Sequence, residues 1–149
     1  MNATVRRRFR PAVLGAAVTL GLAMPSATLA IIPCDQNRPP EIGGFMNPSS
    51  IVEKHHKYTA VEAITVVGDD DSGPVIVELL SAVSSEPDDG LGKGDKPNDI
   101  VQLDLTHFLV RAELGRDSES RTYTFTYRAT DGCGATDETS ITVTVLPRR

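Results

Sequence analysis

The fold is decided by one stretch, residues 121–130, which reads Arg-Thr-Tyr-Thr-Phe-Thr-Tyr-Arg-Ala-Thr. Large apolar residues alternate here with polar ones. Tyr123, Phe125, Tyr127 and Ala129 occupy one phase, and Thr122, Thr124, Thr126 and Arg128 occupy the other. Successive side chains of a strand point to opposite faces of its sheet. The stretch therefore predicts a strand with one face in a core and the other in solvent.

Similar short runs lie on both sides of this strand. They cover residues 58–67, 75–83, 100–105, 107–114 and 139–146. In three of these runs the alternation predicts which residues face inward. They are Val75, Val77, Leu79 and Val83 in the second run, Phe108, Val110, Ala112 and Leu114 in the fourth, and Ile141, Val143 and Val145 in the last. In the fourth run the inward residues alternate with His107, Leu109, Arg111 and Glu113. Turn-forming residues separate the runs, and no window after the N-terminus shows helical spacing. About seven strands predict a single all-β domain, an antiparallel sandwich of two sheets.

The N-terminus has the order of an export signal. Arg6, Arg7, Arg8 and Arg10 precede an apolar stretch from Ala12 to Met24, and small residues follow up to Ala30. This order predicts a signal peptide over 1–30. Its apolar core is shorter than the ~20 residues that a permanent anchor needs. We expect an extended segment over 31–50 and the sandwich domain over 51–149, secreted to the periplasm or the medium.

The exported part is acidic. All 20 acidic residues and 11 of the 15 basic residues follow the signal, which gives a formal charge of about −9. A surface of this charge repels nucleic acid and attracts cations or basic partners. No second apolar segment is long enough to span a membrane. We therefore expect neither a nucleic-acid partner nor a membrane span.

Two cysteines, Cys34 and Cys133, belong to the exported part. In an oxidising compartment a disulfide between them is the default. The alternative is a pair of free thiols, or of thiols that bond to other chains.

Two groups of acidic residues form a candidate calcium site. Calcium needs several oxygen ligands, which irregular backbone can supply. The candidates are Asp69, Asp70, Asp71 and Asp131 in one group and Glu86, Asp88, Asp89, Asp95 and Asp99 in the other. Their spacing does not fit an EF-hand. Asp is also a common turn residue, so the alternative is that these side chains are solvated in turns.

Catalytic motifs are absent from the sequence, and we expect no catalytic residues. His55 and His56 are adjacent and His107 is isolated, whereas a transition-metal site needs three or more convergent ligands. No Gly-x-Ser-x-Gly elbow occurs. The alternative function is a small secreted enzyme, or a metal-dependent hydrolase, on a sandwich scaffold. Acids and a histidine converging in one pocket would favour it.

Several segments together resemble the Ig-like repeats of secreted bacterial proteins, which are related to hyalin-repeat and cadherin-like modules. The matching segments are residues 38–42, Lys54-His55-His56-Lys57, residues 85–95, Arg111-Ala112-Glu113 and residues 121–132. They extend over most of residues 38–146. The family often has a cysteine in the acidic loop at Asp69, and this chain lacks it.

The resemblance implies an Ig-like sandwich on an exported protein and no particular reaction. We expect a non-enzymatic binding or structural module, with a protein or surface glycan as partner, that acts in adhesion or surface-protein interaction. The missing cysteine leaves Cys34 as the only internal partner for Cys133. An Ig-like strand order also places both cysteines at the end that holds loops 69–73 and 131–137. Loops 84–99 and 115–120 fall at the opposite end.

Overall fold

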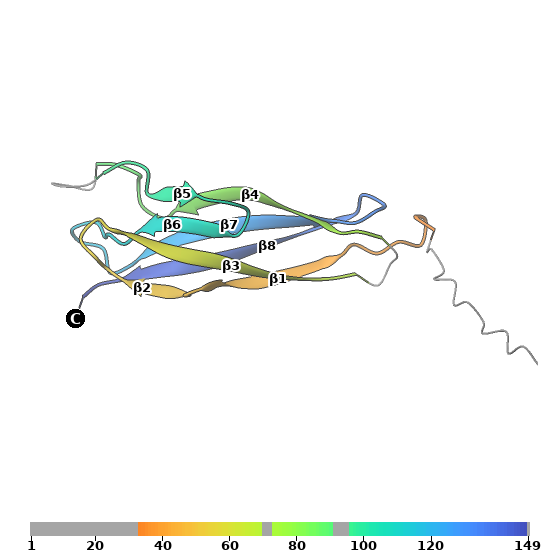
Figure 1. Cartoon of the computed structure of the whole chain (residues 1–149), viewed down its shortest axis with the longest axis horizontal. Coiled ribbons are helices and arrows are strands. Elements are labelled where there is room, and N and C mark those ends of the chain that lie inside the picture. Colours follow the sequence, from red (N-terminus) through yellow and green to blue (C-terminus); the bar gives the residue numbers. More distant parts are fainter. Residues whose placement is uncertain (1–32, 70–72, 91–95, 149) are drawn as a thin grey trace, which may run out of the picture.

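The computed structural model describes residues 33–69, 73–90 and 96–148, which form a sandwich of two β-sheets without any helix (Figure 1). The eight strands are β1 (Glu41–Asn47), β2 (Ser50–Val52), β3 (Tyr58–Gly68), β4 (Ile76–Ser84), β5 (Ile100–Gln102), β6 (His107–Arg111), β7 (Arg121–Thr130) and β8 (Thr136–Leu146). One sheet has the order β1-β3-β6-β5 and the other β2-β8-β7-β4. The prediction of an all-β sandwich is confirmed. No helix in these ranges is long and apolar enough to cross a membrane, and the predicted signal peptide lies outside them.

β7 lies between β8 and β4 and has the predicted facing. Tyr123, Phe125, Tyr127 and Ala129 are all fully buried. The hydroxyls of the two tyrosines find carbonyl acceptors: Tyr123 Oη donates to Arg111 O at 2.7 Å, and Tyr127 Oη donates to Leu105 O at 2.8 Å. Burial raises the pKa of both hydroxyls, that of Tyr127 to about 12. Both therefore remain protonated donors at neutral pH.

The core fills the space between the sheets. Phe108 of β6 and Phe125 of β7 meet across it with their ring centroids 4.5 Å apart. The buried apolar residues are Ile42, Met46, Ile51, Val61, Ala63, Phe108, Val110, Ala112, Tyr123, Phe125, Tyr127, Ala129, Ile141, Val143 and Val145. The predicted inward sets of residues 107–114 and 139–146 are among them, except for Leu114, which packs against the core only partly buried.

The predicted facing of β4 is correct for its first half and wrong for Val83. Leu79 pairs with Tyr127 but Ser81 pairs with Thr126, so Leu80 is an extra residue in a β-bulge. The bulge shifts the alternation by one position. Ala82 therefore packs against the core, while Val83 is 53% exposed.

The predicted facing of Arg111 and Glu113 is also wrong. We expected both on the solvent side of a strand over 107–114, but β6 ends at Arg111. Arg111 is the last residue of the ladder, and its contact with Asp99 covers it, whereas Glu113 lies beyond the ladder, where alternation no longer dictates direction. Arg111 is 6% and Glu113 1% exposed, so both charged residues are buried.

β1 lies inside the segment 31–50 that we expected to be extended. It pairs antiparallel with β3, and Gly44 lies opposite Thr65. A Cβ on Gly44 would lie 2.4 Å from the carbonyl oxygen of Ile64, so this close approach requires glycine. The chain then crosses to the other sheet, where β2 pairs parallel with β8.

A disulfide joins Cys34 to Cys133, whose Cα atoms are 5.5 Å apart. The predicted pairing is confirmed. We call this the disulfide end of the sandwich; it includes the β7–β8 turn and the residues before β1. The opposite end, which we call the arginine end, holds the turn 53–57, the loop 84–99 and the loop 112–120. The bond closes a loop of 99 residues. The loss of chain entropy in the unfolded state alone would raise the free energy of unfolding by up to about 4–5 kcal/mol.

Candidate functional site

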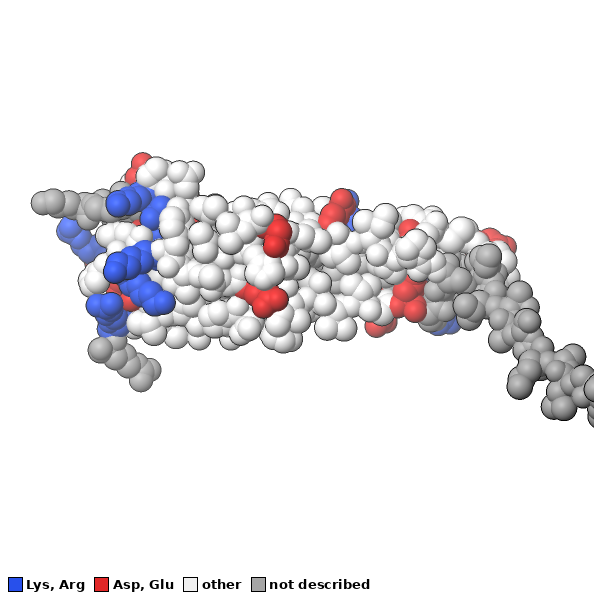
Figure 2. Space-filling model, viewed as in Figure 1, with Lys and Arg blue, Asp and Glu red and all other residues white. Residues whose placement is uncertain are grey.

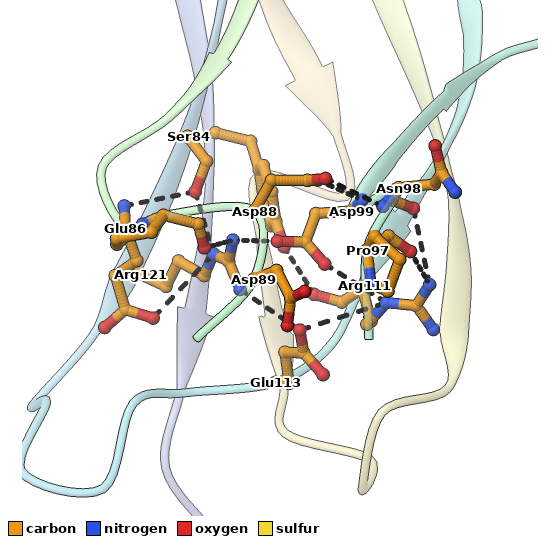
Figure 3. Close-up of polar contacts among 12 residues, drawn as sticks. Ser84, Glu86, Asp88, Asp89, Pro97, Asn98, Asp99, Arg111, Glu113 and Arg121 are labelled. Carbon is orange, nitrogen blue, oxygen red and sulfur yellow. Dashed lines mark hydrogen bonds and ion pairs between the residues drawn. The ribbon is translucent and has the colours of Figure 1, made fainter. Parts of the chain in front are cut away.

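Buried ion pairs fix the described parts of the long loop 84–99, residues 84–90 and 96–99, to the arginine end. Asp99, a calcium candidate, is 1% exposed. Its Oδ1 accepts a hydrogen bond from Arg111 Nε at 3.1 Å, and its Oδ2 accepts one from Arg121 Nη2. The solvated-turn interpretation is therefore wrong for Asp99. We call Asp99, Arg111, Glu113 and Arg121 the arginine cluster (Figure 3).

Arg121 lies at the start of β7, in the phase of the inward aromatic residues, and its side chain is fully buried. The guanidinium carbon of Arg121 lies 5.0 Å from the centre of the Tyr123 ring. Two further bonds reach the loop: Nη2 donates to Pro87 O at 3.1 Å, and Nε donates to Ser84 Oγ at 2.8 Å. Arg121 thus ties both Asp99 and the beginning of the loop to β7.

Arg111, at the end of β6, holds the other half of the loop. Its Nη2 donates to Pro97 O and to Tyr58 Oη, both at 2.8 Å. Its Nη1 donates to His56 O at 3.0 Å. The guanidinium carbon also lies 4.3 Å from the centre of the Tyr58 ring, a cation–π arrangement. Arg111 therefore links the loop to the turn 53–57.

Glu113 connects Arg121 to His56. Glu113 Oε1 lies 3.3 Å from Arg121 Nη1, and its Oε2 lies 2.5 Å from His56 Nδ1. His56 and its neighbour His55 both have positive φ. Both belong to a turn, in which Lys57 N donates to Lys54 O. His55 contacts Arg148 at 3.1 Å, and His107 contacts Asp104 at 3.0 Å, so the three imidazoles do not share a site.

Asp88, another calcium candidate, caps the end of the loop. Its two carboxylate oxygens accept from the amides of Asp99 at 2.7 Å and Asn98 at 2.9 Å. These two bonds lower the pKa of Asp88, with a smaller contribution from the charges of Arg121 and Arg111. The carboxylate is therefore used to hold the backbone that carries Asp99.

Glu86 and Asp89 are the other described candidates of this loop. Glu86 Oε2 accepts from the amide of Gly115 at 3.1 Å and lies 3.8 Å from Arg121 Nε. Its Oε1 is buried without a hydrogen-bond partner among the described residues. Asp89 Oδ1 accepts from the amide of Gly90 at 2.8 Å. A cavity of about 410 Å³ between β4 and β5 has Glu86, Asp88 and Asp99 in its lining.

At the disulfide end, Asp131 shapes the β7–β8 turn. Its Oδ1 accepts from the amides of Cys133 and Ala135, both at 2.9 Å, and its Oδ2 accepts from Asn37 Nδ2 at 2.7 Å. The bond from Asn37, followed by those from the turn amides, lowers the pKa of Asp131. Asp131 therefore supports the same junction as the disulfide.

The remaining candidates are Asp69, Asp70, Asp71 and Asp95. Asp69 lines a groove with Arg38 and Glu41. The other three lie outside the described residues. Across 33–69, 73–90 and 96–148, no group of three or more His, Cys, Asp or Glu side chains could hold a metal ion. Calcium binding by this chain stays a prediction.

The sequence carried one signal of the arginine cluster that we did not use. Arg121 has the same odd phase as Tyr123 and Phe125, which places it inside the sandwich. A buried guanidinium requires carboxylates nearby. That rule could have directed attention to Glu113 and Asp99, although nothing local selects them among the 20 acidic residues.

Comparison with protein-family models, with curated proteins and with solved structures finds no match for this chain. The functional argument therefore rests on the sequence and on the geometry described above.

Proposed function

We propose that the chain is an exported Ig-like module that acts by binding a partner at a surface and catalyses no reaction. Strand order supports the Ig-like assignment. Immunoglobulin constant-type sandwiches have sheets A-B-E-D and C-F-G. Numbered along this chain, β1-β3-β6-β5 corresponds to the first sheet and β4-β7-β8 to the second, with β2 as an additional edge strand beside β8. Tyr123, near the start of β7, bonds back to Arg111 O much as the tyrosine of an Ig corner does.

Export is supported by two independent features. The N-terminal arginines and the apolar run after them have the order of a signal peptide. The disulfide between Cys34 and Cys133 is a bond that persists in oxidising compartments and is rare in the cytosol. We therefore expect the module to act in the periplasm or outside the cell.

The observation that carries the binding proposal is that Arg121 and Asp99 fix the two described parts of loop 84–99, residues 84–90 and 96–99. Loops that a scaffold holds rigidly lose little entropy on binding, so they make good recognition surfaces. The carboxylates here are bonded to guanidinium or amide groups. That arrangement suits support of a loop better than proton transfer, which needs a group open to the substrate.

The charge distribution also distinguishes the arginine end. In Figure 2 the Lys and Arg side chains of the visible face gather at this end, whereas Asp and Glu predominate over the rest of that face. The exposed basic residues nearby include Lys54, Lys57, Lys96 and Arg148. We expect the partner, a protein or a surface glycan, to contact this end in adhesion or surface-protein interaction.

The test compares two charge reversals of equal size. Full-length protein, expressed for export, is immobilised and exposed to solubilised surface material from the producing cell, with calcium or with a chelator. Lys57→Glu alters an exposed basic residue at the arginine end, and Arg38→Glu alters an exposed basic residue before β1 at the other end. We expect the first variant to lose the material that the wild type retains and the second to keep it. Equal retention by all three proteins would contradict the proposal.

Calcium stabilisation is a separate part of the proposal, and calorimetry decides it. Calcium is titrated into the chelator-treated protein, and the melting temperature is measured with and without the ion. Heat of binding together with a higher melting temperature would make calcium part of the module. The absence of both would remove calcium from the description and leave the rest intact.

A further inference from the structure

β4 is an unusual edge strand. It lies at the end of its sheet, beside β7 only, and is nine residues long. It carries exposed apolar side chains at Ile76, 68% exposed, at Leu80 and at Val83. A cavity, not a neighbouring strand, adjoins its last residues. Long apolar edges are templates for pairing with another chain, and natural proteins usually protect them.

The terminal strands at the other edges of the two sheets are shorter than β4. β2 and β5 have only three residues each. β1 is capped near its start, where the amide of Ile42 donates to Asp137 Oδ2 at 3.0 Å. β4 contains no Lys, Arg or Pro, the residues that commonly block edge pairing. Its one charged residue, Glu78, is partly neutralised by Arg128 at 3.4 Å.

The bulge gives β4 a two-fold pattern. Before Leu80, the outward residues are Ile76 and Glu78; after it, they are Ser81 and Val83. Along the outer face the order is therefore apolar, polar, polar, apolar in either direction. Val77 and Ala82 have matching positions on the inner face, and both pack against the core. A strand with this pattern is complementary to an antiparallel copy of itself.

We propose that β4 pairs antiparallel with β4 of a second copy of this chain, around a two-fold axis between Leu79 and Leu80. In this register Ile76 lies opposite Val83 of the second copy, Val77 opposite Ala82, and Glu78 opposite Ser81. Apolar residues meet apolar ones, and each pair occupies a single face of the joined sheet. The interface is isologous, so it closes as a dimer and cannot grow into a fibre.

Neighbouring registers fit less well. A shift by one residue places outward side chains opposite inward ones. A shift by two places Glu78 opposite Val83, a carboxylate against an apolar side chain. In the proposed register the two Glu78 side chains are offset by three positions, about 10 Å along the strands, so their repulsion is small. The bulges lie at the axis, which leaves the pairing on both sides regular.

The average molecular mass of the protein, measured as a function of its concentration, tests the pairing. A single strand pair buries less surface than stable dimers usually do, so we expect a weak, reversible dimer. In sedimentation equilibrium of the full-length exported protein, the average mass should rise with concentration from one chain toward two. Val83→Lys should weaken association by at least about tenfold, because a lysine on the edge would face Ile76.

The matched control is Val66→Lys. Val66 is 65% exposed and lies on β3 in the other sheet, where it pairs with Gly43 of β1. Circular dichroism and thermal melting establish that both variants fold. We expect Val66→Lys to dimerise like the wild type. A wild type that stays monomeric at every concentration, or equal effects of the two variants, would overturn the proposal.

Cysteine cross-linking tests the register. Opposite residues of an antiparallel pair have Cα atoms about 4.5–5.5 Å apart, within disulfide range. A double variant, Ile76→Cys with Val83→Cys, should form a covalent dimer on mild oxidation. Neither single variant should do so, since the two copies of residue 76 would be about 24 Å apart. Cross-linking of a single variant as fast as the double would refute the register.

Discussion

Arg121 and Asp99 are 22 residues apart in the chain, yet their side chains form an ion pair in which neither exposes more than 1% of its surface. Arg121 begins β7, and Asp99 ends the longest loop that the strands leave between them. The pair therefore joins the start of a central strand to the residue that precedes β5. It is the central contact of the arginine end.

Removal of Arg121 should be far more damaging than removal of an exposed arginine. Arg121→Met removes one of the two guanidinium groups that bind the buried Asp99, and the one that hydrogen-bonds Glu113, which costs about 3–5 kcal/mol of unfolding free energy. Urea unfolding followed by circular dichroism measures the loss. Arg128→Met is the control, because Arg128 pairs with Glu138 on the surface. Equal losses of unfolding free energy in both variants would show that burial of the Arg121–Asp99 pair adds nothing to stability.

The strands could be read from the sequence because their physics is local. Tyr123 and Phe125 face the core because alternation along β7 is regular and the ladder to β8 is unbroken. Val83 was placed on the wrong face because the bulge at Leu80 depends on how β4 fits β7, which the sequence of β4 does not reveal. Alternation predicts a face only as long as pairing stays in register.

The arginine cluster could not be read in the same way. Its hydrogen bonds join residues 8 to 22 positions apart, and Glu113 lies beyond the end of β6, where no ladder dictates direction. The pairing of the two cysteines was easier to predict, because an oxidising compartment favours a disulfide and the strand order places both cysteines at the same end of the sandwich. Candidate acids could be gathered by composition, but only the structure separates Asp99, which pairs with two arginines, from Asp89, which bonds to its neighbour's amide.

Asp88 should make the protein more stable at neutral pH than in acid. Bonds from the amides of Asp99 and Asn98 lower its pKa below the ordinary 3.8 in the folded state. The stabilisation is therefore complete above about pH 4 and is lost as the pH falls through the folded pKa. In urea unfolding between pH 2 and 6, Asp88→Asn should be less stable than the wild type at pH 6, and the difference should shrink toward pH 2. A constant difference across that range would contradict this assignment.

The two adjacent glycines of β1 should differ in how far substitution by alanine lowers the unfolding free energy. At Gly44 a Cβ would collide with the carbonyl of Ile64, while at Gly43 no atom lies within 4 Å of one. Gly44→Ala should lower the unfolding free energy by about 1–3 kcal/mol, as overpacking does. Gly43→Ala should change it little. Thermal melting of the two variants makes the comparison, and a loss at Gly43 as large as that at Gly44 would disprove the close approach of β1 to β3.

The disulfide should stabilise the whole domain without supporting the loop at the other end. Cys34→Ser with Cys133→Ser should cost up to about 4–5 kcal/mol, because the unfolded chain regains the freedom of a loop of 99 residues. The contacts of Arg121 lie at the opposite end, so Arg121→Met should cost a similar amount with or without the disulfide. A double-variant cycle by urea unfolding measures this. Strong coupling between the two ends would contradict it.

Hydrogen exchange at the amides of Asn98 and Asp99 is the most direct test of the claim that buried ion pairs fix the end of loop 84–99, residues 96–99, to the sandwich. Both amides donate to Asp88, and Arg111 donates to Asp99 and to the carbonyl of Pro97 on the same segment. We predict that they exchange at least about 100-fold more slowly than an unstructured chain, and that Arg121→Met abolishes the protection under conditions in which the amides of β7 and β8 remain protected. Exchange in the wild type at the unstructured rate would contradict the account.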